Sequence, residues 1–206
     1  MDGLSNTSLP QLLLRFAAFL AAAGLHGWTL ARTARWQGDP GPKQDGRETP
    51  NPLAHLGLLG TVSAVLFSLP WIKPIVPDPA ELRRPRSGPA FVVVAALAAN
   101  LALAALLSAS RQAIVALVPA DAGRTALLVV EALIEANLAL VAVAALPIPP
   151  FTAGLLWTLG GLVSRDRWSR LSGPFAAALF AAAVAFDLQP VLRPLIDALA
   201  RLVRYG

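Results

Sequence analysis

Apolar positions along the chain gather in long runs, separated by shorter stretches rich in proline, glycine and basic residues. The first run covers residues 11–36, and its uncharged part lies between Arg15 and Arg32. Later runs cover residues 53–72, 89–110, 125–146, 152–163 and 172–188. A helix of about 20 apolar residues can cross the hydrocarbon core of a bilayer while satisfying its own backbone hydrogen bonds. The pattern therefore predicts an all-α, polytopic membrane bundle of about four to six hydrophobic segments.

The run at residues 53–72 is interrupted by two glycines and a proline, which leaves two topologies open. If this run crosses the membrane with the others, the basic residues divide almost evenly between the two sides. If it enters and returns on one side, the loops around Lys43 and Arg84 share that side, and eleven of the 17 Lys and Arg residues lie there. This asymmetry favours the re-entrant topology, and the positive-inside rule then predicts that residues 32–52 and 73–89 are cytoplasmic.

The C-terminal stretch, residues 190–206, has a different pattern from the spanning runs. Its charged side chains lie on one helical face, and its apolar side chains lie on the other: Val191, Leu192, Leu195, Ile196, Leu199, Leu202 and Val203. This pattern is typical of an amphipathic helix at the membrane interface. We therefore predict two parts, a membrane domain at residues 1–189 and an amphipathic helix at residues 190–206.

Composition supports the membrane assignment. The chain is 56% hydrophobic and 14% charged, and its net charge of +5 is spread through short loops rather than gathered in one basic domain. This distribution predicts membrane lipids and other membrane proteins as partners, and it argues against nucleic acid. The absence of cysteine excludes disulfide and thiol chemistry. The N-terminus has no basic n-region, so we expect the first run to be retained rather than cleaved as a signal peptide.

Several motifs follow one another in a fixed order. They are "GDPGPKQDGRETPNPLAHLGLLGT" (38–61), "WIKPIVPDPAELRRPRSG" (71–88), "ALAANLAL" (96–103) and "ALPIPPFTAG" (145–154). Over residues 20–165 this order resembles the small bacterial members of the site-2 protease family of intramembrane zinc metalloproteases. That family shows HExxH, GDP, NPLxHIDPxGT, WxKPVPVNPxxLRxPR, GPLANL and NLLPIPPLDGG in the same sequence. The resemblance implies a location in the bacterial inner membrane.

The resemblance also identifies what this chain lacks. It places His26 on the first histidine of HExxH, Gly27 on the general-base glutamate and Leu30 on the second histidine. Thr152 stands where the family has its aspartate ligand, and the histidine of the NPLxH motif is retained as His55. A hydrolytic zinc takes three protein ligands and an open position, with a carboxylate to accept the proton from water. We therefore expect no zinc, no other cofactor and no protease activity.

Three functions follow as hypotheses. The first is a non-catalytic site-2-protease-like protein that acts as a scaffold or accessory subunit, binding a transmembrane segment or a larger membrane complex. The second is a divergent zinc protease, with donors drawn from His55, Asp39, Glu131 and Glu135. The third is an accessory subunit of an energy-converting assembly, in which Glu131 and Glu135 line a proton path.

Individual residues leave alternatives open. His26 is a remnant, a packed neutral histidine, or a ligand of a metal or haem together with His55. Glu131 and Glu135 lie four residues apart on one face of an apolar helix, where carboxyl groups are costly and tend to face a cavity or a partner. Their roles are proton handling or partner docking; otherwise Glu131 reaches the interface and Glu135 is protonated or paired in the bundle. The loop at residues 73–89 is a partner-binding strand or faces lipid headgroups.

The resemblance makes a geometric prediction. His26, Leu30 and Thr152 should face one another in a dry, packed site, and Gly27 should leave room for another helix. Restoring the motif by Gly27→Glu, Leu30→His and Thr152→Asp should then create a zinc-binding trio. The "LPIPP" sequence should break the helix before it, because proline removes a backbone donor and disfavours helix in the residue that precedes it.

Overall fold

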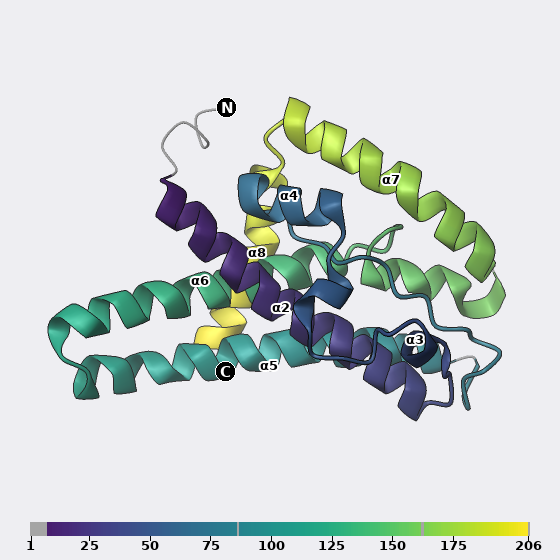
Figure 1. Ribbon diagram of the computed structural model, residues 1–206, viewed down its shortest axis with the longest axis horizontal. Coiled ribbons are helices and arrows are strands. Elements are labelled where there is room, and N and C mark those ends of the chain that lie inside the picture. Colours follow the sequence, from purple (N-terminus) through teal and green to yellow (C-terminus); the bar gives the residue numbers. More distant parts are fainter. Residues whose placement is uncertain (1–7, 86, 162, 206) are drawn as a thin grey trace.

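The computed structural model describes residues 8–85, 87–161 and 163–205, and within them every element is a helix (Figure 1). In chain order these are α2 (Leu9–Trp36), α3 (Gly41–Gln44), the 3₁₀ helix η1 (Pro52–His55), α4 (Leu58–Phe67), α5 (Gly88–Leu117), α6 (Ala120–Ala144), the 3₁₀ helix η2 (Thr152–Gly161), α7 (Arg165–Ala185) and α8 (Gln189–Tyr205). The helices α2, α5 and α6 are long and apolar enough to cross a membrane, and α7 with α8 forms a fourth candidate, bent by 102°. The predicted all-α membrane bundle is confirmed.

Small side chains bring the three long helices together. In α2, Ala22 and Ala31 are fully buried, as are Ala96 and Ala104 in α5. Alanine allows close backbone approach, which drives helix association where lipid tails compete with every larger apolar side chain. α5 and α6 form an antiparallel hairpin, and α2 crosses both of them (Figure 1). The centre of the bundle is therefore the place where α2, α5 and α6 meet.

The segment at residues 53–72 enters the bundle and returns. Its only α-helix, α4, has 10 residues, so it is about 15 Å long, roughly half the thickness of a hydrocarbon core. The chain reverses at Ser68, which has a φ of 54°, and continues without regular structure to Lys73, where the backbone amide donates to the carbonyl of His55 over 2.7 Å. The two ends of this segment therefore lie together, as the re-entrant alternative predicts.

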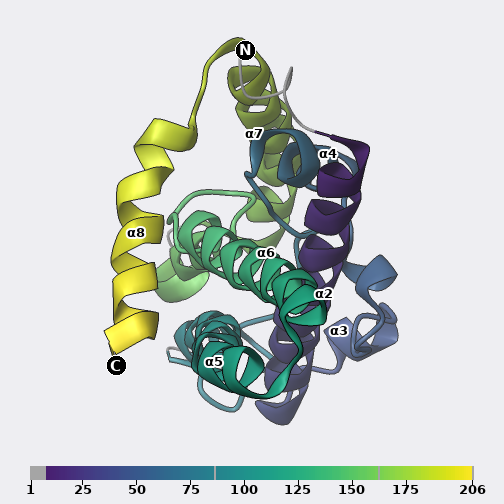
Figure 2. The same cartoon turned by 90° about the vertical axis from the view of Figure 1, so that its left-hand side faces the viewer.

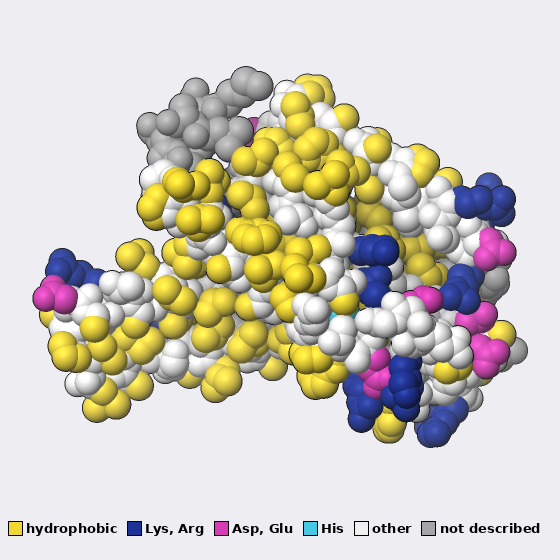
Figure 3. All heavy atoms as spheres, in the orientation of Figure 1, with side chains coloured by type: hydrophobic (Ala, Val, Ile, Leu, Met, Phe, Trp, Pro, Cys, Tyr) yellow, Lys and Arg dark blue, Asp and Glu magenta, His cyan; other side chains and the backbone are white. Residues whose placement is uncertain are grey.

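The loops that flank this segment lie together at one end of the molecule. The amide of Arg83 donates to the Gln37 carbonyl over 2.6 Å, and the Arg47 guanidinium donates to the Lys73 carbonyl over 2.9 Å. Figure 3 shows basic and acidic side chains gathered at this end, and hydrophobic side chains covering most of the remaining visible face. The two loops that flank residues 53–72 therefore lie at the same end of the molecule.

The chain after α6 follows the predicted break. α6 ends at Ala144, and residues 146–151 form turns that lead into η2. The helix α7 begins before the apolar run at residues 172–188, because the basic stretch at residues 164–170 contains its N-cap, Ser164, and its first residues. Ser164 caps this helix by accepting from the amide of Arg167 over 3.3 Å, and Trp168 is buried with its indole N–H donating to the carbonyl of Gly154.

The C-terminal helix α8 packs against the bundle. Figure 2 shows α5 and α6 nearly end on, with α8 running across one side of them. Its apolar face, which includes Ile196, Leu199 and Val203, contacts a buried cluster that includes Ile134 and Leu138 of α6. The apolar stripe predicted from the sequence is thus covered by protein as well as available to lipid. The division into residues 1–189 and 190–206 stays a prediction.

Candidate functional site

His26 lies at the centre of the bundle, where four elements meet. Its Nδ1 is 2.8 Å from the Oδ1 atom of Asn100 in α5, and its Nε2 is 2.8 Å from the Oγ1 atom of Thr152 in η2. His26 and Asn100 are fully buried, and Thr152 is 7% exposed. The predicted meeting of His26 with Thr152 is therefore observed, across 126 residues of sequence.

Two asparagines extend this cluster into a network. The Asn100 amide nitrogen donates to the carbonyl of Ala22 over 3.1 Å and to Oδ1 of Asn137 over 2.8 Å. Asn137 in α6, which is also fully buried, donates in turn to the Leu133 carbonyl. The network therefore links α2, α5, α6 and η2 through hydrogen bonds between buried polar groups.

The donors in the network assign the tautomer of His26. The two bonds that the Asn100 amide nitrogen donates leave Oδ1 facing His26, and because an amide oxygen can only accept, Nδ1 of His26 carries a proton. Both ring partners are uncharged, and a charged imidazole is costly to bury among them. A neutral ring then accepts the Thr152 hydroxyl proton at Nε2, which is the nitrogen that would otherwise be free to bind a metal. His26 is thus the packed, neutral histidine among the alternatives from the sequence.

Leu30 fills the position one turn after His26. It is 1% exposed and belongs to an apolar cluster with Ile72, Ile75 and Val92, among others. Residues four apart lie on the same helical face, so His26 and Leu30 point the same way from α2. Hydrocarbon therefore occupies the place where the resemblance puts a second imidazole, and the predicted packed environment is observed.

The imidazole of His55 covers Gly27. A Cβ atom at residue 27 would fall inside the His55 ring, so only glycine allows this contact. Gly27 therefore leaves room for the approach of the 3₁₀ helix η1, whose His55 ring packs directly on it. The motif restoration through Gly27→Glu is sterically excluded for the same reason, unless His55 moves.

His55 itself is fully buried in η1. Its Nε2–H donates to the Thr49 carbonyl over 2.9 Å, and its Nδ1 has no partner among the described residues. Burial lowers the pKa of His55; the bond to Thr49 raises the pKa by less, and the charge of Arg47 lowers it further. His55 is therefore neutral at physiological pH, and it stabilises the contact between the re-entrant segment and α2.

The remaining candidate donors lie in other places. Asp39, which is 2% exposed, accepts backbone N–H groups of Gly41 and Asp78, each over 2.8 Å, and so joins the two flanking loops. Glu131 pairs with Arg111 of α5, with Oε2 2.6 Å from Nη2. Glu135 lies 3.9 Å from a guanidinium nitrogen of Arg193 in α8. Within the described residues no three His, Asp or Glu side chains form a possible metal site.

Zinc does not fit the central site. Its donors are one imidazole, one hydroxyl and two amides, and each of the two imidazole nitrogens already has a hydrogen-bond partner. Catalytic zinc is bound by histidine, carboxylate or thiolate side chains, with a carboxylate base nearby. Joint ligation of one iron by His26 and His55 is equally unsupported, because only Nδ1 of His55 lacks a partner and it faces Gly27.

Glu131 and Glu135 face a cavity of about 460 Å³ between α5, α6 and α8. Arg111, Arg193, Arg201 and Arg204 also line it. The two carboxyl groups are half exposed and pair with arginines, at 50% and 62% side-chain exposure. The structure therefore separates them from the His26 network. It pairs Glu135 with Arg193, which the sequence left as one alternative for Glu135, and it pairs Glu131 with Arg111.

Asn100 and Glu48 make contacts that the sequence pattern did not predict. Asn100 was visible as a single amide within an apolar run, where the cost of burying it indicates an interhelical partner. Glu48 accepts from Arg32 over 2.7 Å and from Arg35 over 2.5 Å, and so joins the loop to the end of α2. Arg32 and Arg35 lie three residues apart and so share one face of α2, and this pattern could have predicted an acidic partner.

No family model, curated protein or solved structure matches this chain. The resemblance to site-2 proteases therefore rests on the order of the sequence motifs.

Proposed function

We propose that this protein is a non-catalytic, site-2-protease-like integral membrane protein that acts as a scaffold or accessory subunit for other membrane proteins. One observation carries the proposal. His26 stands where the resembled family has a zinc ligand, and both of its ring nitrogens are in hydrogen bonds to uncharged side chains, Asn100 and Thr152. Such a network joins helices and leaves no open coordination position or general base.

The surroundings support a structural role for this centre. The apolar side chain of Leu30 is buried one turn after His26, and the ring of His55 packs on Gly27. By sequence, eleven basic residues fall on the side that holds residues 32–52 and 73–89, which supports a cytoplasmic placement of that side under the positive-inside rule. In a bacterium this membrane would be the inner membrane.

Metal analysis and a cleavage assay test the absence of catalysis. The purified full-length protein should carry far less than one zinc per chain, and it should not cleave transmembrane substrates in detergent or vesicles. One zinc per chain, together with cleavage that His26→Ala abolishes, would establish the divergent protease instead. Thr152→Ser and Thr152→Val then separate structure from chemistry, because serine keeps the hydroxyl and valine keeps the shape.

The matched pair has a defined outcome. Thr152→Val should lower the free energy of unfolding by about 1 kcal/mol, since Nε2 of His26 loses its partner, and Thr152→Ser should lower it by less. Thermal unfolding in detergent measures both. Partner binding, followed by co-purification from native membranes, should decline only as far as the fold is destabilised. A partner lost equally from both variants at unchanged stability would place Thr152 in a contact site rather than in a structural network.

The energy-converting alternative has its own test. If the ion pairs are structural, Glu131→Gln together with Glu135→Gln should leave the proton flux of the assembled complex unchanged. Loss of proton flux from a stable, fully assembled complex would support the proton path. The half-exposed ion pairs with Arg111 and Arg193 favour the structural role.

A further inference from the structure

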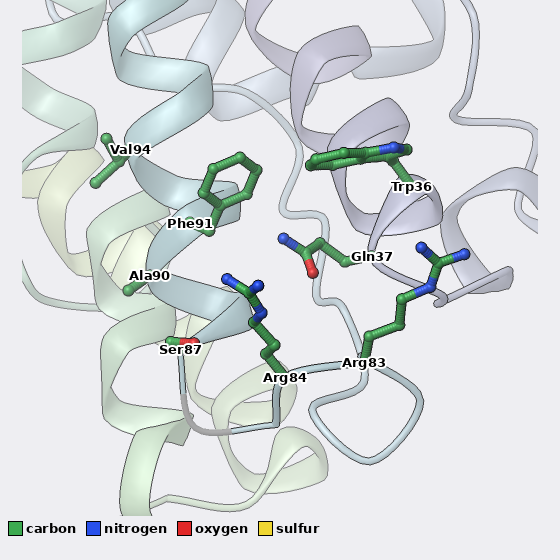
Figure 4. Close-up of a pocket in the computed structure, with 8 residues that line it drawn as sticks. All are labelled: Trp36, Gln37, Arg83, Arg84, Ser87, Ala90, Phe91 and Val94. Carbon is green, nitrogen blue, oxygen red and sulfur yellow. The ribbon is translucent and has the colours of Figure 1, made fainter.

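A second pocket lies at the basic end of the bundle, away from the His26 network. Figure 4 shows it between the end of α2 and the start of α5. Its volume is about 520 Å³. The residues lining it are of two kinds, polar or basic at one side and apolar at the other: Gln37, Arg83, Arg84 and Ser87, then Trp36, Ala90, Phe91 and Val94.

The two arginines are supplied by a backbone with defined contacts at both ends. The amide of Arg83 donates to the Gln37 carbonyl over 2.6 Å, and the carbonyl of Arg84 accepts from the amide of Gly88 over 2.6 Å. Gly38 has a φ of 117°, and a Cβ there would lie 2.8 Å from the Glu81 carbonyl oxygen. Glycine thus allows the loop to approach α2 closely, and this approach places both guanidinium groups beside the pocket.

The guanidinium groups are available to a ligand. Figure 4 shows the Arg84 side chain pointing up between Gln37 and Phe91, and that of Arg83 rising below Trp36. Within the described part of the chain, neither arginine has an acidic side chain within the 4.0 Å of an ion pair. The N-terminus of α5, at Gly88, adds a positive potential in the same direction. The polar side of the pocket therefore favours an anion.

The apolar side favours a hydrocarbon chain beside that anion. Phe91 and Val94 lie on the outer surface of α5 at 45% and 61% exposure, and Trp36 is 64% exposed at the last residue of α2. The rings of Trp36 and Phe91 are 5.8 Å apart and form a continuous wall. Tryptophan at the end of a spanning helix is typical of the level where headgroups meet acyl chains.

We infer that this pocket binds an anionic phospholipid of the surrounding bilayer, with its phosphate on Arg83 and Arg84 and an acyl chain along Phe91 and Val94. Arginine forks suit phosphate because two N–H groups can donate to two of its oxygens. The lipid enters from the bilayer, because Phe91 and Val94 lie on the outer surface of a spanning helix. This inference is independent of whether the protein is a scaffold or an enzyme.

Native mass spectrometry of the full-length protein tests the site. The probes are phosphatidylglycerol and phosphatidylcholine with identical dioleoyl chains, and glycerol phosphate as the headgroup without chains. Phosphatidylglycerol should bind roughly tenfold more tightly than phosphatidylcholine, since each arginine near a membrane surface contributes a several-fold preference for anionic lipid. Glycerol phosphate at millimolar concentration should not displace it.

Matched charge variants locate the preference. Arg83→Gln with Arg84→Gln should reduce the preference to within about twofold of unity, whereas Arg167→Gln with Arg170→Gln, on α7 outside the pocket, should change it by less than about twofold. Arg83→Lys with Arg84→Lys should keep a preference for phosphatidylglycerol. Phe91→Ala should weaken both lipids without creating a preference for phosphatidylcholine. Circular dichroism and size-exclusion profiles of each variant report folding.

Three results would overturn the inference. Equal binding of the two lipids would show that the arginines do not select charge. An equal loss in the two glutamine pairs would show a general surface effect rather than a pocket. Displacement of the lipid by glycerol phosphate alone would show a site for free anions. If the glutamine pair fails to fold, the lysine pair and Phe91→Ala still decide between these outcomes.

Discussion

At the scale of single residues, the identity of each residue in the central site depends on its neighbours. Gly27 is required because the ring of His55 occupies the space of its missing side chain, and Asn100 is required because it accepts from His26 while donating to Asn137. Within the network, His26, Asn100, Asn137 and Thr152 each bond to a side chain of another element. Removing one partner therefore leaves another buried group unsatisfied, which costs more than the lost bond alone.

Gly27→Ala tests the contact with His55. The added Cβ overlaps the imidazole, so we expect the free energy of unfolding to fall by about 1 to 3 kcal/mol, as in other overpacked sites. Gly123→Ala is the control, since a Cβ there meets its nearest neighbouring atom, the carbonyl oxygen of Val118, at an ordinary 3.5 Å. Adding His55→Ala to Gly27→Ala should recover part of the loss in a double-mutant cycle. Equal stability of the two alanine variants would contradict the packing described here.

The lowered pKa of His55 predicts an acid-sensitive fold. Burial disfavours the charged imidazole in the folded state, while in the unfolded chain the imidazole has its ordinary pKa of 6.5. The contribution of His55 is therefore complete above pH 6.5 and is lost as the pH falls below that value. We expect the unfolding temperature in detergent to decrease between pH 7.5 and pH 5.5, and to decrease less in His55→Gln. A parallel pH profile in both proteins would assign the sensitivity to other groups.

At the scale of elements, the sequence predicted the helices from their apolar runs and the break after α6 from its prolines. It also predicted that His26 meets Thr152, because the motif order placed them on the two sides of one site. The partners of Asn100 lie 37 to 78 residues away, and no local pattern identifies them. The start of α7 was missed because the burial of Trp168 outweighs the polar composition of its first turn.

Asp39 joins the two loops that flank the re-entrant segment, as the His26 network joins the long helices. Its two oxygens accept amides on both sides of the re-entrant segment, at Gly41 and at Asp78. Asp39→Ala should leave these amides without partners and loosen the loop at residues 73–84, at a cost of about 1 to 3 kcal/mol. Hydrogen exchange should show faster exchange at Asp78 in that variant. Asp45→Ala, an exposed residue with the same charge, should leave exchange there unchanged.

At the scale of the whole molecule, one end carries most of the basic residues and two loops joined by backbone hydrogen bonds. The structure fixes these loops on one side, while charge alone predicts which side that is. The pocket lined by Arg83 and Arg84 depends on this arrangement, because one of its walls is the loop bonded to Gln37. The membrane topology of these loops is therefore worth measuring directly.

The absence of cysteine makes the topology directly measurable. Single replacements Asp45→Cys, Glu81→Cys and Arg124→Cys, all at exposed positions, can be labelled with a membrane-impermeant maleimide in intact cells and in inverted vesicles. Residues 45 and 81 should be labelled from the same side, because the segment between them returns without crossing, and residue 124 should be labelled from the opposite side. The positive-inside rule assigns the shared side to the cytoplasm, so only inverted vesicles should label residues 45 and 81. Labelling of these two residues from opposite sides would require residues 53–72 to cross the bilayer, and the joined loops described above would then be impossible.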